Sequence, residues 1–239
     1  LYGFICNRGN PPPQAVLDRI KKLVELESVT LLAGHCMWPM YRKQDGTSQY
    51  PWGTASGRVD QTGNRRMMEY VKEQYPKVKR VLYFHCYLDP SDNAPTDFAD
   101  SRVLRSDGTV AVYGQYGFQY FPVEGSRYAA GLEKVIAMIF ERVGCDGVYW
   151  DEFGSSCDPY TYGEPWDGVS GDIGYDGKLL RRKSSVRLLS LPWRLKMVKQ
   201  IKERDAAFIT NGNFLPRHAA ELKVQNFVET AAISNCLKT

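Results

Sequence analysis

Two adjacent carboxylates, Asp151 and Glu152, follow a short apolar run and are the residues best suited to chemistry. A turn signal at residues 146–147 precedes this run, and residues 148–150 are rich in β propensity. The segment therefore predicts a buried parallel strand that delivers acids at its C-terminal end. In barrels of alternating strands and helices, this end carries the active site. The structural alternative is that Asp151 caps a loop or pairs with an arginine.

Side chains alternate between the two faces of a strand, so Asp151 and Glu152 are expected to face opposite ways. Asp151 continues the face of Gly147 and Tyr149 and is the better candidate for the barrel axis. Glu152 is then expected to hydrogen-bond a neighbour or a sugar hydroxyl.

Polar and aromatic side chains also follow the other predicted strands. Amides, imidazoles and aromatic rings beside carboxylates suit a sugar, because carboxylate pairs hydrolyse glycosidic bonds and amides bind hydroxyls. The predicted catalytic carboxylates are Asp151, Glu152 and Glu229. The predicted substrate-binding residues are Asn7, Arg8, His35, Trp38, His85, Tyr87, Asp89, Tyr149, Trp150, Asn211 and Asn213.

The elements that must position these residues alternate along the chain. Strands are predicted at 2–6, 29–33, 81–87, 148–150, 206–210 and 224–228, and helices at 11–24, 64–75, 128–143, 186–204 and 217–222. The long loops all follow strands, which is typical of a (β/α)₈ barrel whose strand C-terminal ends carry the site.

Six strands are too few for a closed barrel, so the prediction is an α/β TIM-type barrel truncated after about six βα units. The whole chain, 1–239, is expected to form this one incomplete domain, with long loops at about 36–63, 89–126 and 153–185. The rival is a doubly wound open sheet. The sequence lacks the Gly-rich phosphate loop that such a sheet often carries after its first strand.

Composition limits the partners. The net charge is +4 without a long basic block, so no nucleic-acid partner is expected. No run reaches the roughly 20 apolar residues of a membrane helix. No cofactor is predicted, and the six cysteines are expected to be mostly reduced, with a Cys36–Cys157 disulfide left open. The expected partners are a carbohydrate substrate and further domains of a longer parent chain. No signal peptide is visible, although a polysaccharide substrate favours an extracellular or periplasmic location.

The segment 147–152 and the acids at strand ends resemble the TIM-barrel glycoside hydrolases, and loosely their α-galactosidase-type clan of retaining enzymes. In that clan the nucleophilic Asp follows strand four and the acid/base carboxylate follows strand six. Asp151 and Glu229 occupy these positions, although the acid/base of the clan is usually Asp. The resemblance implies a retaining glycosidase that acts on an oligo- or polysaccharide, with Asp151 as nucleophile and Glu229 as acid/base. The clan with Glu after strands four and seven fits less well, because Glu152 follows Asp151 where that clan has Asn.

Two other functions stay open. The barrel could bind carbohydrate without cleaving it, as a domain of a larger protein. In either carbohydrate function, Trp38, Trp150 and the aromatic residues of 160–166 are expected to line one cleft, because flat rings stack on sugars. A metal-dependent barrel hydrolase would use His35, His85, Asp89 and Asp151. Zinc-dependent barrels often begin with His-x-His after strand one, whereas this chain has Asn7 and Arg8, so no metal site is predicted.

Overall fold

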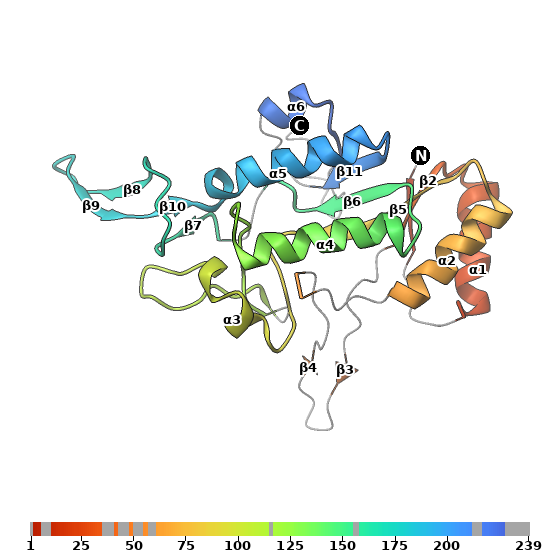
Figure 1. Cartoon of the computed structure of the whole chain (residues 1–239), viewed down its shortest axis with the longest axis horizontal. Coiled ribbons are helices and arrows are strands. Elements are labelled where there is room, and N and C mark those ends of the chain that lie inside the picture. The colour runs from red at the N-terminus through yellow and green to blue at the C-terminus, as the bar shows by residue number, and fades with distance from the viewer. Residues whose placement is uncertain are drawn as a thin grey trace.

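The computed structural model describes residues 2–5, 11–34, 41–42, 48–49, 55–56, 61–114, 117–154, 158–211 and 217–227. Its main sheet has six strands that pair in parallel and lie side by side in sequence order (Figure 1). This order confirms the predicted barrel-type topology, since a doubly wound sheet would reverse its strand order. The strands are β1 (Tyr2–Ile5), β2 (Leu31–Gly34), β5 (Lys79–His85), β6 (Gly147–Asp151), β11 (Ala207–Asn211) and β12 (Gln225–Phe227).

Helices connect these strands and cover the outer side of the sheet (Figure 1). Serines begin two of the longer helices, because the hydroxyl oxygens of Ser126 and Ser185 accept hydrogen bonds from the backbone N–H groups three residues later. None of the described helices is long and apolar enough to cross a membrane. The helices are α1 (Gln14–Lys21) with its π-helical extension η1 (Lys22–Leu26), α2 (Gln61–Gln74), α4 (Arg127–Glu141), α5 (Val186–Glu203) and α6 (Arg217–Glu221).

The sheet is curled into a half-barrel. The ring centroids of Phe4 in β1 and Tyr149 in β6 lie 5.1 Å apart, although β2 and β5 separate these strands. In a flat sheet, three strand spacings would place the two strands about 14 Å apart. The curvature brings strand ends that are distant along the sheet toward one another, as a barrel requires.

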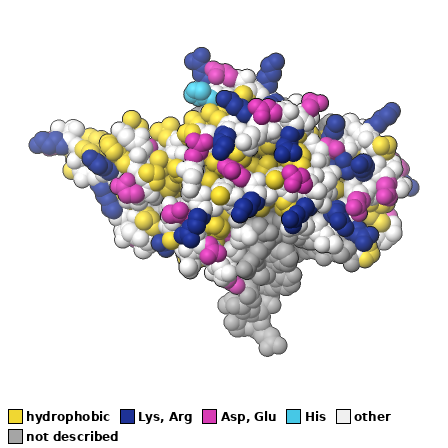
Figure 2. Space-filling model, viewed as in Figure 1, with side chains coloured by type: hydrophobic (Ala, Val, Ile, Leu, Met, Phe, Trp, Pro, Cys, Tyr) yellow, Lys and Arg dark blue, Asp and Glu magenta, His cyan; other side chains and the backbone are white. Residues whose placement is uncertain are grey.

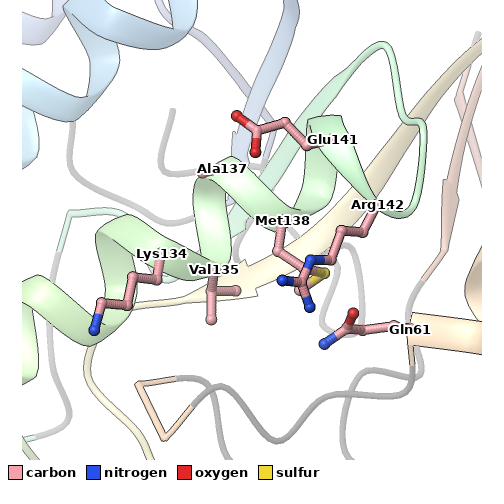
Figure 3. Close-up of a pocket in the computed structure, with 7 residues that line it drawn as sticks. All are labelled: Gln61, Lys134, Val135, Ala137, Met138, Glu141 and Arg142. Carbon is pink, nitrogen blue, oxygen red and sulfur yellow. The ribbon is translucent and has the colours of Figure 1, made fainter.

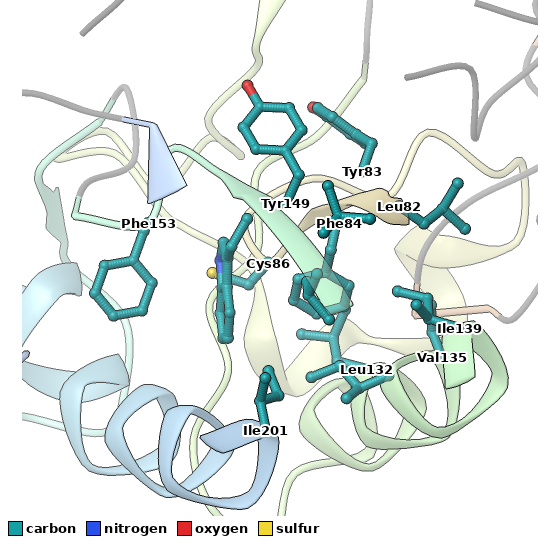
Figure 4. Packing of buried hydrophobic residues seen from close by; sticks show 14 of the residues in the cluster. Leu82, Tyr83, Phe84, Cys86, Leu132, Val135, Ile139, Tyr149, Phe153 and Ile201 are labelled. Carbon is teal, nitrogen blue, oxygen red and sulfur yellow. The ribbon is translucent and has the colours of Figure 1, made fainter. Parts of the chain in front are cut away.

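The two faces of the sheet differ. Figure 4 shows Phe84 pointing toward α4 and α5, and Tyr83 and Tyr149 pointing away from them. Trp150 lies on the helix-facing side, where the centroid of its ring is 4.8 Å from that of Phe84. We call the opposite side the inner face.

Two long excursions follow β5 and β6. The first contains α3 (Ala94–Asp97), the 3₁₀ turn η2 (Ala99–Ser101) and a hairpin-like pairing, in which an antiparallel bridge joins Val112 to Phe118. The second was predicted as a loop but contains four short strands. β7 (Tyr160–Thr161) pairs with β10 (Ser184–Ser185), and β8 (Gly171–Ile173) pairs with β9 (Leu179–Arg182) to form a projecting hairpin (Figure 1). Between β2 and α2, β3 (Tyr41–Arg42) pairs with β4 (Ser48–Gln49).

Candidate active site at the C-terminal ends of the strands

Asp151 is the last residue of β6, and neighbouring side chains hold both of its carboxylate oxygens. Its Oδ1 accepts hydrogen bonds from Asn211 Nδ2 at 2.8 Å and from the Tyr149 hydroxyl at 3.1 Å. Its Oδ2 accepts from the Tyr83 hydroxyl at 2.9 Å. Tyr83 and Tyr149 pair in register on adjacent strands, which places both hydroxyls on the inner face with Asp151. The structure therefore brings together three residues of the predicted site, Asp151, Tyr149 and Asn211.

Tyr83 is a member of the site that the sequence analysis missed. Burial and, after it, the charge of Asp151 raise the pKa of Tyr83 well above its ordinary value. The hydroxyl therefore stays protonated at any pH near neutral and remains a donor to Asp151. Tyr83 precedes His85 by two residues, so the alternation of strand residues could have placed it on the same face.

Glu152 takes a different direction from the one that the sequence predicts. Its φ of +48° is a left-handed conformation, which interrupts the alternation where the strand ends. Its carboxylate lies 3.1 Å from His85 Nε2 and accepts a hydrogen bond of 3.0 Å from the Tyr113 hydroxyl. His85 pairs in register with Asp151, so Glu152 reaches a partner on the inner face. The expectation of opposite faces is thus wrong for these two carboxylates.

The tautomer of His85 follows from its contacts. Its Nδ1 accepts a hydrogen bond of 3.0 Å from the backbone N–H of Tyr87, so the ring proton sits on Nε2. Nε2 then donates to Glu152, which acts as an acceptor for both His85 and Tyr113. Tyr113 lies in the excursion after β5 and was not predicted, because nothing in its local sequence points to the strand ends.

Three residues of the predicted substrate-binding set are not brought to the inner face. Trp150 is fully buried on the helix-facing side, with its ring 5.7 Å from that of Trp193. Tyr87 is also fully buried, and its hydroxyl lies 3.0 Å from Ser190 Oγ. These two placements correct the prediction that both rings contact substrate.

The third residue, Asp89, anchors loops. It accepts hydrogen bonds from the backbone N–H groups of Ser56 and Ser91 and from the Ser91 hydroxyl. Burial raises the pKa of Asp89, although these hydrogen bonds oppose the rise. With 1% of its surface exposed, Asp89 has no face for a sugar, which corrects its predicted role.

The remaining predicted site residues lie outside the described residues, and their roles stay predictions. They are Asn7, Arg8, His35, Trp38, Asn213 and Glu229.

The loop aromatic residues after β6 are engaged by cations of the same excursion. The Lys183 ammonium lies 4.3 Å from the ring centroid of Tyr160, and the guanidinium of Arg182 lies 4.5 Å from that of Trp166. Arg181 lies over Tyr162 at 4.6 Å. Each of these rings has a cation over one face, and these contacts stabilise the excursion. The covered faces are therefore not available to stack on a sugar in the predicted cleft.

A cavity of about 370 Å³ lies elsewhere, between α4 and the first residue of α2 (Figure 3). None of its lining residues belongs to the group of side chains around Asp151 and Glu152. Across the described parts of the chain, no group of three or more His, Cys, Asp or Glu is arranged to hold a metal. The cavity is lined by Gln61, Lys134, Val135, Ala137, Met138, Glu141 and Arg142.

Comparison with known proteins yields similarity of structure alone. No protein-family model matches the sequence, and no curated protein matches it. A cycloisomaltooligosaccharide glucanotransferase from Paenibacillus sp., complexed with cycloisomaltoheptaose, matches over 88% of this chain with a TM-score of 0.53 and 12% identity. A mutant of Kfla1895 in complex with isomaltose matches over 95% with a TM-score of 0.50 and 10% identity.

The fold is that of an incomplete TIM-type barrel. Carbohydrate-active enzymes share it, but this chain spans only 30% of the glucanotransferase and 33% of Kfla1895. A hypothetical protein from Ruminiclostridium thermocellum matches over 95% of this chain and 96% of its own, with a TM-score of 0.50 and 10% identity. At these identities the similarity describes the fold and assigns no activity.

Proposed function

We propose that this barrel is a glycoside hydrolase of the retaining type, which acts on an oligo- or polysaccharide and uses Asp151 as its nucleophile. The observation that carries the proposal is the setting of Asp151. It is a carboxylate at the C-terminal end of the fourth parallel strand, and three neutral side-chain donors orient both of its oxygens. Active sites of such barrels lie at this end of the strands, which supports a catalytic role for this carboxylate.

The two oxygens of Asp151 are not equivalent. Oδ1 accepts from Asn211, from Tyr149 and from the backbone N–H of Glu152 at 3.1 Å, which engages its lone pairs fully. Oδ2 accepts only from Tyr83 among the described residues. Oδ2 therefore keeps electron density for attack, and we assign it as the oxygen that bonds to the anomeric carbon.

The first step breaks the bond between the anomeric carbon and the glycosidic oxygen as Oδ2 forms its bond to that carbon. The leaving oxygen takes a proton from the acid/base, for which Glu229 is the predicted residue. Water then attacks the anomeric carbon, gives its proton back to that residue and releases Asp151. In this scheme Glu152, held by His85 and Tyr113, accepts hydrogen bonds from sugar hydroxyls beside the reacting carbon. A retaining mechanism requires about 5–5.5 Å between the nucleophile and the acid/base.

The choice of first substrates follows the sugars in the similarly folded complexes, isomaltose and cycloisomaltoheptaose. Product release is measured by chromatography for the wild type, for Asp151→Asn and for Asp176→Asn. Asp176 is a matched control because it is an exposed carboxylate in the turn of the projecting hairpin, away from the inner face.

We expect Asp151→Asn to lose turnover by a factor on the order of 10⁴ while it still binds sugar, because an amide cannot act as the nucleophile. The turnover of Asp176→Asn should equal that of the wild type. Full activity of Asp151→Asn would refute the assignment. A wild type that binds sugars in calorimetry but releases no product would instead be the non-catalytic carbohydrate-binding barrel.

A further inference from the structure

Arg194 of α5 is a buried cation that serves only neutral acceptors. It is 1% exposed, and its Nη1 donates to the backbone carbonyl of Phe153 at 2.6 Å. Its Nη2 donates to the carbonyl of Arg187 at 2.9 Å, and its Nε donates to Ser190 Oγ at 3.2 Å. Among the described residues it has no carboxylate partner within ion-pair distance. Burying a charge without a counter-charge is costly, so its fixed hydrogen bonds call for an explanation.

Phe153, the residue that Arg194 holds, directly follows the two acids. Its backbone N–H donates to the carbonyl of Asn211 on β11 at 3.1 Å, while its own carbonyl accepts from Arg194 on α5. Its ring packs edge-on against Trp150, with 5.1 Å between centroids, and the Arg194 guanidinium lies 5.1 Å from its centroid. Two elements thus hold both backbone polar groups of Phe153 on the helix-facing side.

This anchorage accounts for the conformation of Glu152. The chain leaves β6 at Asp151 on the inner face and must reach the helix-facing side at Phe153, with only Glu152 between them. A left-handed turn at Glu152 makes this crossing, although a residue with a Cβ disfavours it. The same turn sends the Glu152 carboxylate toward His85 and Tyr113.

We propose that Arg194 is a positioning residue of the site: by holding the Phe153 carbonyl, it fixes Glu152 in the left-handed conformation that places its carboxylate beside His85 and Tyr113. An arginine suits this task because its planar fork donates in three directions at once, to one strand end and to two points on its own helix. The consequence for catalysis rests on the proposed glycosidase function, whereas the geometric claim does not.

The geometric claim is tested without substrate, by ¹⁵N NMR of the His85 ring. The wild type should show a protonated Nε2 whose proton exchanges slowly with water, because Glu152 accepts it. In Arg194→Met the turn is released, and we expect that exchange to accelerate at least about tenfold, by the arithmetic of a lost buried hydrogen bond. Arg194→Lys should recover part of the protection, because an ammonium can still reach one acceptor.

Arg80→Met is the matched control. Arg80 is also buried, at 7% exposed, but it pairs with Asp146 at the opposite end of the strands. It should lose stability and leave the His85 signal unchanged, which separates positioning from a general loss of packing. If Arg194→Met does not fold, Arg194→Gln is measured in its place, since glutamine is too short to reach the Phe153 carbonyl. An unchanged His85 signal in the folded neutral variant would overturn the proposal.

The second measurement is the turnover of the Arg194→Met variant. If the proposed function holds, Arg194→Met should lower kcat about 100-fold with little change in KM, the size expected for a misplaced group near the reacting atoms. If His85 responds as expected but the wild type cleaves no sugar, the positioning role stands and the glycosidase proposal fails.

Discussion

The hydroxyl of Tyr83 is a single-residue determinant of the site, because it is the described donor to Asp151 Oδ2. Tyr83→Phe removes the hydroxyl that makes this hydrogen bond and keeps the ring. A hydrogen bond to a charged group contributes about 1.5–3 kcal/mol, so kcat should fall by a factor of about 10–100. Steady-state kinetics on the first sugar that the wild type cleaves would measure it.

Tyr128→Phe is the control for this change. Tyr128 is also buried, but its hydroxyl has no hydrogen-bond partner among the described residues. Its removal should leave kcat unchanged and the free energy of unfolding equal or slightly raised, since a buried unsatisfied hydroxyl is itself unfavourable. Equal kinetics for the two phenylalanine variants would show that Tyr83 does not orient the nucleophile.

Strand periodicity predicted part of this residue-scale arrangement. Asp151 shares the inner face with Tyr149, as alternation required, and Asn211 reaches Asp151 because parallel strands end at one rim. The direction of Glu152 escaped prediction, because contacts of Phe153 with Asn211 and Arg194, distant in sequence, set its backbone. The local sequence around Glu152 does not predict contacts with residues so distant along the chain.

At the scale of elements, Gly147 shows how closely β6 and β11 approach. A Cβ on Gly147 would lie 1.8 Å from the carbonyl oxygen of Ala207, which is a backbone atom and cannot rotate away. Gly147→Ala should therefore push the two strands apart. We expect it to lower the free energy of unfolding by about 3 kcal/mol or more, as overpacking of a well-packed core does. Urea unfolding would measure the loss.

Gly108→Ala is the comparison. Gly108 has a φ of +84° but no heavy atom within 4 Å of the added Cβ. It should cost only about 1–2 kcal/mol, the ordinary penalty for a left-handed residue with a Cβ. Similar losses in the two variants would mean that the close strand contact is not what restricts Gly147.

The excursion after β6 has an acid-sensitive anchor, Asp167. Its carboxylate accepts from the backbone N–H groups of Val169, Ser170 and Ser185 and from the Ser170 hydroxyl. Burial acts to raise the pKa of Asp167, but these hydrogen bonds outweigh it and lower the pKa to about 2.

Because the folded pKa is depressed, this contribution to stability is present above about pH 4 and is lost as the pH falls toward 2. Hydrogen exchange at Val169 and Ser170 should speed up over that range, while exchange in β6 stays slow. Asp167→Asn should show the fast exchange already at neutral pH. Loop exchange that does not depend on pH in the wild type, after correction for intrinsic rates, would contradict the anchor.

Prediction of elements succeeded where burial imposes a period and failed where it does not. All six strands of the main sheet were predicted to within two residues, because most of them are apolar runs between turn signals. The strands β8 and β9 were missed, since their side chains are mostly exposed and carry no alternation. The pairing of such short segments depends on the geometry of the turn between them.

At the scale of the whole molecule, exposed apolar side chains are concentrated on one projection. Figure 2 shows basic and acidic side chains interspersed over the visible face. Large exposed apolar side chains gather on the projecting hairpin, where Ile173, Tyr175 and Leu180 are 60%, 115% and 71% exposed. Such a tip is prone to association, so Leu180→Lys should raise solubility without a change in the unfolding midpoint. Light scattering and urea unfolding would check both.

Global stability has a separate anchor at the end of the sheet away from the site. Arg80 and Asp146 join β5 to the turn before β6 through a two-pronged ion pair of 2.6 and 2.8 Å, and Asp146 also accepts from the Arg80 backbone N–H at 2.9 Å. Burial acts to raise the pKa of Asp146, but the hydrogen bonds and charge of Arg80 outweigh it and lower the pKa. The pair therefore stabilises the fold fully above about pH 4, and this stabilisation is lost as the pH falls below that value.

Asp146→Asn should reduce the free energy of unfolding by about 1–3 kcal/mol at pH 7, because Arg80 stays buried with weaker partners. The gap between variant and wild type should narrow at pH 3, because the carboxylate is then largely protonated in the unfolded chain and the wild type loses part of this contribution. Urea unfolding at the two pH values measures this difference. A gap of the same size at both would show that Asp146 acts through packing and not through its charge. Because the anchor lies at the opposite end of the strands from Asp151, sugar turnover at pH 7 should not change.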